Sequence, residues 1–281
     1  MDCLYSNGVI AVREKYLLGE RLKRLCEGSA DEAFRQLTEY GFGAGADALS
    51  SRDFEALIAA EEKITDDFIM RYAPSVAVRD YLLLPRDFHN AEALVKAEYL
   101  SLDVTKMLAP EGNYTVALLT NAVQSGDYSK TGDLGDTVKE AVALFSDEDK
   151  KPTGAEIGAL FVRGLYRALH RSCRKNRAVA AILARKADMV NLLTAFRSDN
   201  AKDAEKCYVA GGKLSEQDLA RVFGDAERCE RAFARTDYSA FVQACFEARR
   251  AGMPYTRAER MAAHCEIDDL SRRRFDLNGS E

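Results

Sequence analysis

The sequence lacks the features typical of membrane, secreted and metal-binding proteins. No run of about 18 apolar residues occurs, so we expect no membrane-spanning helix. Residues 1–5 lack the basic and apolar regions of a signal peptide. The seven cysteines include no Cys-x-x-Cys pair, and none of the three histidines has a second His or a Cys at a spacing that would define a metal site. We therefore expect a cytoplasmic protein with reduced thiols, mostly in its core, and with no bound metal or cofactor.

Proline is also scarce, with 5 residues in 281, whereas the helix-favouring residues Ala, Leu, Glu, Arg and Lys are plentiful. The sequence therefore predicts an all-α protein. Its 45 acidic and 40 basic side chains give a formal net charge of −5. A dedicated nucleic-acid-binding protein is normally clearly basic, so we expect no nucleic-acid partner.

A Ser or Thr followed by an acidic residue three positions later is a pattern that caps the start of a helix, and we assign this role to four such pairs. The pairs are Ser29 with Glu32, Thr153 with Glu156, Ser215 with Asp218, and Thr256 with Glu259. We predict that each pair opens a helix.

Apolar spacing and helix-breaking residues place further helices. Residues 10–26 are predicted to form the first helix, with an apolar stripe at Leu18, Leu22 and Leu25. Residues 178–196 are apolar almost all round, which predicts a helix buried on several sides. Other boundaries are predicted at Tyr40, where a helix ends, near Ser51, where one starts, and at Pro85, in the first turn of a helix.

Two stretches 101 positions apart share one spacing pattern. They are Asp87-Phe88-His89-Asn90, with Lys96 six residues after the Asn, and Asp188-Met189-Val190-Asn191, with Arg197 six residues after the Asn. A glycine turn follows each stretch, at Gly112 and at Gly211-Gly212. Such a repeat indicates a duplicated supersecondary unit, and it favours a pseudo-symmetric structural body over a single catalytic cleft.

A third, degenerate copy is predicted at residues 266–270, where Asp269 stands in place of the Asn. We therefore predict a single all-helical domain over residues 1–281, made of three related units at roughly 1–105, 106–205 and 206–281, with the third unit shortened.

The motif residues Asp87, Asn90, Asp188 and Asn191 are interpreted as a structural repeat motif. Residues three apart share one face of a helix. Asp near a helix start satisfies free N–H groups, and Asn can bridge two backbones. Duplicated joints are also more common than duplicated catalytic pairs. The alternative is a direct functional role for these side chains.

Two other segments are weaker candidates for sites. Residues 41–46 fit the glycine pattern of a dinucleotide-binding loop, but a helix-like segment precedes them where that loop needs a strand. The basic tract at residues 167–177 is either a solvated helix face or a docking surface for an acidic partner, and residues 272–274 have the same two interpretations. The candidate docking residues are Arg167, Arg171, Arg174 and Lys175. No Ser-His-Asp or Cys-His arrangement is supported, so no catalytic residue is predicted.

The motif segments resemble those of a known family. Residues 84–97 resemble the D-F-x-N-x-K-x-L-x-[KR] segment of the C-subunit family of V-type/A-type ATPases, whose eukaryotic members are called d-subunits. Residues 187–193 with Arg197 resemble its second copy, and residues 208–214 resemble the glycine turn that follows. Residues 12–18 and 40–41 resemble the family's N-terminal helix and its end. The chain departs from the family in its loose match at Lys96 and Arg197, and at residues 275–281, where the family usually carries a further helix.

The resemblance implies three related helical bundles arranged as a funnel. It also implies a non-catalytic central-stalk adaptor of a V/A-type rotary ATPase, which couples the shaft to the membrane rotor ring for proton or sodium transport. The partners would be the ring and shaft subunits, and the protein would lie peripherally on the cytoplasmic face of the membrane. Two alternatives stay open. One is a helical scaffold unrelated to rotary motors, and the other is an enzyme with an acidic site near Asp87 or at Glu266, Asp268 and Asp269.

Overall fold

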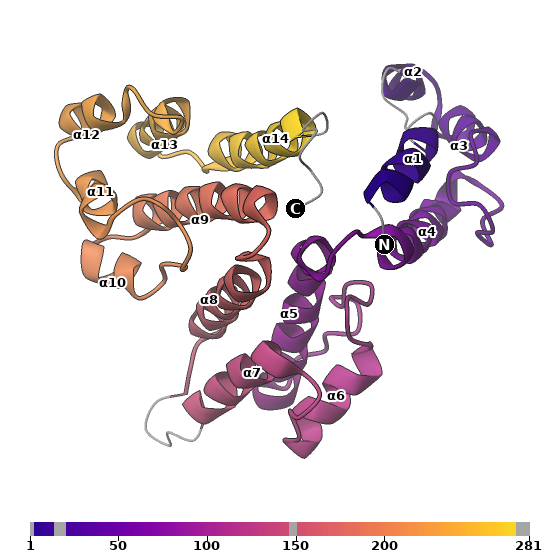
Figure 1. Ribbon diagram of the computed structural model, residues 1–281, viewed down its shortest axis with the longest axis horizontal. Helices are drawn as coiled ribbons and strands as arrows, with labels where there is room; N and C mark the ends of the chain where they lie inside the picture. The colour runs from indigo at the N-terminus through magenta and orange to yellow at the C-terminus, as the bar shows by residue number, and fades with distance from the viewer. Residues whose placement is uncertain (1–2, 14–20, 146–150, 274–281) are drawn as a thin grey trace. The chain divides into compact units, whose positions relative to one another are not determined.

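The computed structural model describes residues 3–13, 21–145 and 151–273. Within these ranges every regular element is a helix, so the all-α prediction is confirmed (Figure 1). The chain forms two compact units, residues 1–79 and 80–281. The predicted repeat boundaries near residues 105 and 205 stay a prediction, as does the funnel arrangement. No helix in the described ranges combines the length and apolarity needed to cross a bilayer.

The first unit consists of short helices and one long helix. They are α1 (Cys3–Arg13), α2 (Arg21–Glu27), α3 (Ala30–Glu39), the 3-10 turn η2 (Ser51–Asp53), α4 (Phe54–Tyr72) and the start of α5 (Val76–Leu100). The capping box of Ser29 and Glu32 opens α3, and Tyr40 is its C-cap, as predicted. The predicted start near Ser51 is also confirmed.

The predicted first helix differs from the structure. Helix α1 already begins at Cys3, and α2 begins at Arg21, while residues 14–20, including Leu18, lie outside the described residues. Leu25 is buried, but Leu22 is 57% exposed. The predicted apolar stripe is therefore wrong at Leu22, because the seven-residue α2 buries only one side chain.

The second unit contains the remaining helices. They are the rest of α5, α6 (Val116–Ser125), α7 (Gly132–Leu144), α8 (Gly154–Cys173), α9 (Arg177–Arg197), α10 (Ala201–Glu205), α11 (Glu216–Ala220), the 3-10 turn η3 (Arg221–Phe223), α12 (Ala226–Phe233), α13 (Ser239–Ala251) and α14 (Thr256–Arg273). The capping boxes at Thr153 and Ser215 open α8 and α11 as predicted. Helix α7 packs on α8, and both α8 and α14 pack on α9.

One predicted helix start and one predicted helix cap are wrong. Pro85 lies in the interior of α5, which begins at Val76, rather than in its first turn. An interior proline costs one backbone hydrogen bond and about 3 kcal/mol or more. Burial of Leu83 and Phe88 on either side offsets that cost, because each is almost fully removed from water. Thr256 is the first residue of α14 rather than its cap, since the carbonyl of Tyr255 already accepts the first helical bond.

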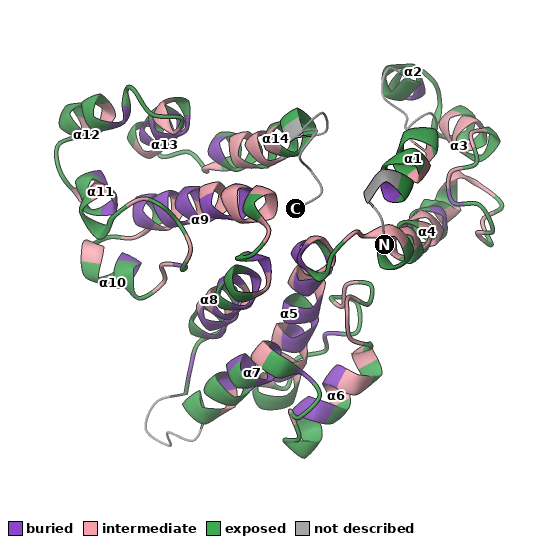
Figure 2. Ribbon diagram, in the orientation of Figure 1, coloured by how far each residue is buried: buried purple, intermediate pink, exposed green. Residues whose placement is uncertain are grey.

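The core of the second unit is built around α9, as Figure 2 shows by the burial colours along this helix. Large apolar side chains of α9, α12 and α13 form one cluster, in which Phe196 meets Phe246 edge-to-face at 4.8 Å. The prediction that residues 178–196 are buried on several sides is confirmed. Asp188 and Asn191 lie in the same buried helix, and Asp87 and Asn90 are equally buried in α5. Burial of four polar side chains demands hydrogen-bond partners for each of them.

Candidate functional site

The first copy of the motif holds a following segment of backbone against α5. Asp87 accepts hydrogen bonds from the backbone N–H groups of Asn113 (2.9 Å) and Tyr114 (3.1 Å). Asn90 accepts from the N–H of Ala109 (2.8 Å) and donates to the carbonyl of the same residue (3.1 Å). We call Asp87 and Asn90, with these contacts, the first joint.

The second copy makes the corresponding contacts from α9. Asp188 accepts from the backbone N–H groups of Lys213 (2.7 Å) and Leu214 (2.8 Å). Asn191 accepts from the N–H of Val209 (2.7 Å) and donates to its carbonyl (3.0 Å). This is the second joint. It has the same donors and acceptors as the first, although the segment it holds lies one residue nearer in the sequence.

The two joints also occupy the same place in their helices. Asp87 and Asp188 are each the twelfth residue of the helix, counted from Val76 in α5 and from Arg177 in α9. The sequence suggested that each Asp binds free N–H groups at the start of its own helix. Their position in mid-helix shows that they do not. The N–H groups that they bind belong to the turn after the helix, which the Asn, three residues further along the same face, binds as well.

Gly112 and Gly212 allow the turns to come this close. A Cβ on Gly112 would lie 2.4 Å from Oδ1 of Asp87, and a Cβ on Gly212 would lie 2.4 Å from Oδ1 of Asp188. Neither glycine has a positive φ, unlike Gly211 at +97°. These two positions therefore need glycine for space rather than for backbone conformation.

The surroundings of the two carboxylates differ. Burial raises the pKa of Asp87 to about 6, against the lowering effect of its bonds to Asn113 and Tyr114, and nearby Asp80 adds to the rise. Asp80 itself accepts from Ser172 of α8 at 2.5 Å. At the second joint the hydroxyl of Tyr238 donates to Asp188 at 2.6 Å, and burial together with this carboxylate raises the pKa of the tyrosine.

The predicted third copy makes contacts of another kind. Glu266 accepts from the ammonium of Lys186 at 2.8 Å and from the hydroxyl of Tyr81. Asp269 accepts from the guanidinium of Arg185 at 3.0 Å. Within the described residues these acids of α14 therefore bind side chains of α5 and α9, whereas the two joints bind the backbone of a turn.

The basic residues after the two motifs also differ from each other. Lys96 pairs with Glu92 at 2.5 Å, one turn earlier in its own helix. Arg197 pairs instead with Glu259, which lies on α14. His89, which the two copies do not share, is exposed, and its Nε2 lies 2.7 Å from the carbonyl of Met107.

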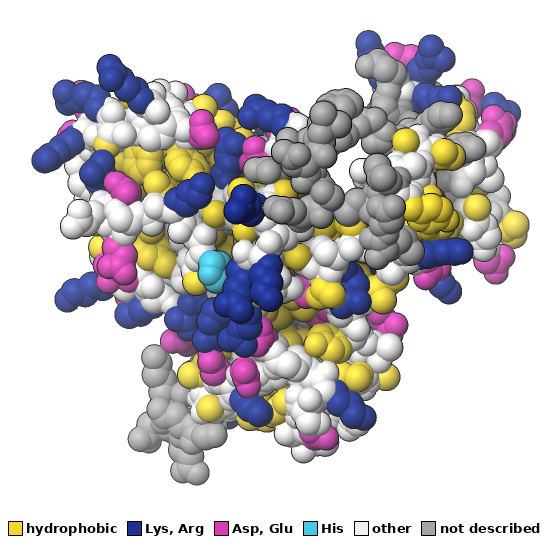
Figure 3. Space-filling view, in the orientation of Figure 1, with side chains coloured by type: hydrophobic (Ala, Val, Ile, Leu, Met, Phe, Trp, Pro, Cys, Tyr) yellow, Lys and Arg dark blue, Asp and Glu magenta, His cyan; other side chains and the backbone are white. Residues whose placement is uncertain are grey.

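The basic tract lies along α8 and at the start of α9, where Figure 3 shows Lys and Arg side chains gathered on the visible face. Arg167 pairs with Glu140 at 2.8 Å, and Arg171 pairs with Asp133. Both of these acids belong to α7. Arg174 and Lys175 follow at the end of α8 and are exposed. The first two cations therefore tie α8 to α7, and the last two face solvent.

The structure adds no support for a nucleotide, thiol or metal site at the other candidate residues. Residues 41–46 form a turn after α3, and the N–H of Gly43 already donates to the carboxylate of Glu61 at 2.8 Å. Burial raises the pKa of Cys173 to about 11, of Cys229 to about 11 and of Cys245 to about 12, so these thiols stay protonated. The described part of the chain contains no cluster of three or more His, Cys, Asp or Glu placed to hold a metal ion.

A model of the family described as ATP synthase (C/AC39) subunit matches residues 7–277 of the chain. The chain belongs to this family. A search of curated proteins and a search of solved structures each found no match. The C/AC39 match extends over both compact units and includes both joints, so the resemblance seen in the motifs is confirmed. Membership implies assembly with other subunits of a rotary ATPase.

Sequence reasoning missed the partners of the two joints in this C/AC39 chain. Ala109 and Val209 were assigned no role, although they lie 19 and 18 residues after their Asn. The offset of 101 between the two motifs pairs Ala109 with Ala210, so extension of the duplication places the second partner one residue away from Val209. The repeat could not have predicted the bond from Tyr238 to Asp188. The offset of 101 pairs Tyr238 with Thr137, which is not a tyrosine.

Proposed function

We propose that the chain is a non-catalytic central-stalk adaptor of a V/A-type rotary ATPase, coupling the shaft to the membrane rotor ring for proton or sodium transport. The match to the C/AC39 family over residues 7–277 carries this proposal. The funnel of three related bundles belongs to the same proposal. The protein would lie on the cytoplasmic face of the membrane and be held there through the complex.

The two joints would serve this role by making the body stiff. An adaptor that transmits torque has to resist shear between its helices and the turns that connect them. Each joint fixes its turn with four hydrogen bonds between one helix face and the backbone. All four side chains are at most 5% exposed, so water competes little for these bonds. Asp87, Asn90, Asp188 and Asn191 would then act on the fold rather than on a substrate.

The same geometry argues against an enzyme that uses the acid of either joint. A general acid or base must reach a substrate proton directly or through one water. Asp87 and Asp188 are 0% exposed, and their oxygens already accept backbone N–H groups. Glu266 and Asp269 are engaged with cations of α9.

The exposed end of the basic tract is the proposed docking patch for a partner subunit. Arg174 and Lys175 would make this contact, while Arg167 and Arg171 would hold α8 on α7. Complementary charge mainly accelerates encounter and selects the partner. The acidic surface that this patch fits would lie on a ring or shaft subunit.

The adaptor role is tested in membranes from cells that lack this chain and are complemented with it. Wild-type protein should co-purify with the ATPase head and ring subunits and should restore ATP-driven ion pumping. Without the chain, ATP hydrolysis by the head should persist while pumping is lost. Asn121→Ala, at an exposed position of α6, is a matched control that should restore pumping fully. Normal pumping in the absence of the chain would contradict the proposal.

A further inference from the structure

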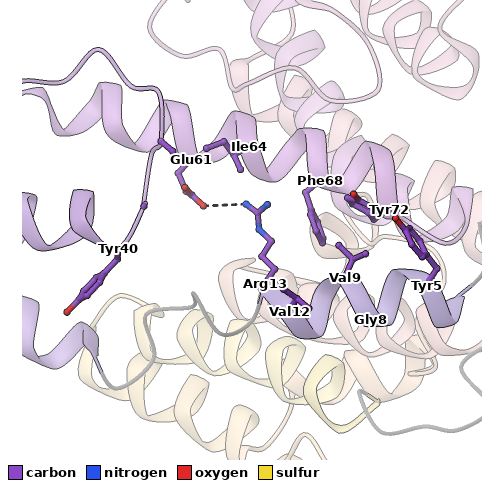
Figure 4. Close-up of a pocket in the computed structure, with 12 residues that line it drawn as sticks. Tyr5, Gly8, Val9, Val12, Arg13, Tyr40, Glu61, Ile64, Phe68 and Tyr72 are labelled. Atoms are coloured by element: carbon purple, nitrogen blue, oxygen red, sulfur yellow. Dashed lines mark ion pairs between the residues drawn. The ribbon is translucent and has the colours of Figure 1, made fainter.

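The first unit contains a wide groove between α1 and α4. It has a volume of about 890 Å³ and is lined mainly by apolar and aromatic side chains. Figure 4 shows Val9, Val12 and Tyr5 of α1 facing Phe68 and Tyr72 of α4. Within the described residues, this groove is larger than the 240 Å³ pocket beside α14.

The walls of the groove are held in place by contacts of their own. Arg13 of α1 pairs with Glu61 of α4 at 3.6 Å, and its guanidinium also lies 4.8 Å from the ring centre of Phe68. Phe68 and Tyr72 lie 4.8 Å apart on α4. The ion pair therefore bridges the two helices between Tyr40 on one side and Phe68 and Tyr72 on the other, as Figure 4 shows.

The first unit buries little of its own apolar surface. In its described part, the buried hydrophobic residues are Leu25, Leu57 and Ala77. Nine large hydrophobic residues are exposed, namely Tyr5, Ile10, Val12, Leu22, Leu49, Phe54, Ile58, Met70 and Val76. Two of these, Tyr5 and Val12, line the groove, and exposed apolar surface within a groove marks an interaction site in a folded protein.

The charge of this unit indicates the chemistry of the occupant. Residues 1–79 contain 14 acidic and 10 basic side chains, whereas residues 80–281 contain 31 and 30. Most of the net charge of −5 therefore belongs to the first unit. Helix α4 carries five acidic and two basic residues, and one of the acids, Glu61, lines the groove. An anionic lipid surface would be repelled by such a helix, and a cationic partner would be attracted.

The shape of the groove indicates a helix. Two helices of 11 and 19 residues, about 16 and 28 Å long, form its sides. An amphipathic helix binds such a groove through apolar anchors at i, i+3, i+4 and i+7. We propose that the groove between α1 and α4 is a docking site for a basic amphipathic helix of another protein, whose apolar face contacts Val12 and Phe68 and whose Lys or Arg side chains face the acids of α4.

The proposal is tested with the full chain and a labelled peptide of about 18 residues, which has Leu at the anchor spacing and Lys elsewhere. Two control peptides carry Glu in place of Lys, or the same Leu and Lys residues in scrambled order. The basic peptide should bind in the micromolar range, and both controls should bind at least about tenfold more weakly.

Variants then locate the bound peptide. Val12→Asp and Tyr5→Ser, at positions 58% and 57% exposed, should each weaken binding about tenfold without a loss of folding. Leu49→Asp is the matched control, because Leu49 is 91% exposed and does not line the groove. Asp67→Lys should weaken the basic peptide and strengthen the acidic one.

Several results would overturn the proposal. They are no binding of the basic peptide, equal binding of the acidic peptide, or equal binding by Val12→Asp and the wild type. The groove would be assigned to another ligand if the peptide does not bind while anionic vesicles or a small apolar dye do, and if Val12→Asp abolishes that binding. A lower melting temperature of Tyr5→Ser with no peptide binding would show that the groove is closed within the chain. These results do not depend on the rotary-ATPase role, since no other subunit is present.

Discussion

Asn191 exchanges two hydrogen bonds with one residue, Val209, accepting from its N–H at 2.7 Å and donating to its carbonyl at 3.0 Å. Asn90 makes the same pair of bonds with Ala109. An amide side chain used in this way replaces the partner that a neighbouring strand or helix would otherwise provide for the backbone. The helices and the turns that follow them are thereby fixed to each other in both copies.

Replacement of Asn191 by Ala should lower the free energy of unfolding by about 1–3 kcal/mol, because it leaves the buried N–H and carbonyl of Val209 without partners. Urea denaturation of the purified chain measures this change. Asn121→Ala, at an exposed position, should leave stability within about 0.5 kcal/mol. Defects in assembly should follow from the lost stability. Unchanged melting together with lost ion pumping would point instead to a direct functional role for Asn191.

Gly112→Ala and Gly212→Ala should each destabilise the fold by about 1–3 kcal/mol, because the new Cβ would lie 2.4 Å from the joint carboxylate. Gly154→Ala provides the comparison, since a Cβ there meets no atom within 4 Å and alanine favours a helix. Thermal unfolding of the three variants should separate the first two from the third. Equal melting temperatures for all three would show that the turns can move away from the helices.

The first joint should make stability depend on pH. The folded pKa of Asp87 is raised to about 6 from an ordinary value of 3.8, so the folded state binds the proton more tightly than the unfolded state. The contribution of Asp87 is therefore fully present below about pH 4 and is lost as pH rises to about 6, by at most about 3 kcal/mol.

Asp87→Asn tests this by removing the titration. The variant should be less stable overall, since an amide has only one oxygen for the two N–H donors of the turn. The difference in unfolding free energy between wild type and variant should shrink as pH rises from about 4 to about 6. A difference that is constant over this range would contradict the assigned pKa.

Arg249 should be essential for the second unit, whereas its neighbour Arg250 should not be. Arg249 donates to the carbonyls of Phe196 (2.7 Å) and Val222 (3.0 Å) and lies over the ring of Phe196. Arg249→Ala should cost about 2–4 kcal/mol, because it leaves backbone carbonyls at the end of α9 without this donor. Arg250 makes an exposed pair with Glu230, so Arg250→Ala should cost less than about 1 kcal/mol. Denaturant unfolding measures both variants, and similar losses of unfolding free energy would contradict the different roles of Arg249 and Arg250.

The docking role of the basic tract predicts a salt-dependent association rate. Reversal of Arg171 and Arg174 to Glu should slow association with the partner most at low salt, since the Debye length is about 10 Å at 0.1 M. Reversal of Arg174 and Lys175 is the sharper variant, because Arg171 also pairs with Asp133 within the chain. Arg228 and Arg235 on and beside α12 are exposed, and their reversal is a control of equal charge. If all these variants bind purified ring and shaft subunits as the wild type does, the tract is a solvated helix face and not a docking surface.

The sequence by itself determined the helical class, several helix starts and the position of the duplicated motif. These features depend on neighbouring residues: the cap at Thr153 needs only Glu156 three positions on, and the scarcity of charged residues in 178–196 is visible along α9. The spacing of Asp87 and Asn90, repeated at Asp188 and Asn191, is equally local.

The tertiary structure decided what those side chains bind, because their partners come from 18 to 27 residues away. Asp87 could have capped a helix start, and only the packing of the turn on α5 places it opposite Asn113 and Tyr114. Pro85 stays inside a helix for the same reason, since burial of its neighbours outweighs a local preference. Burial and long-range hydrogen bonds depend on which segments meet, and spacing along the chain does not contain that information.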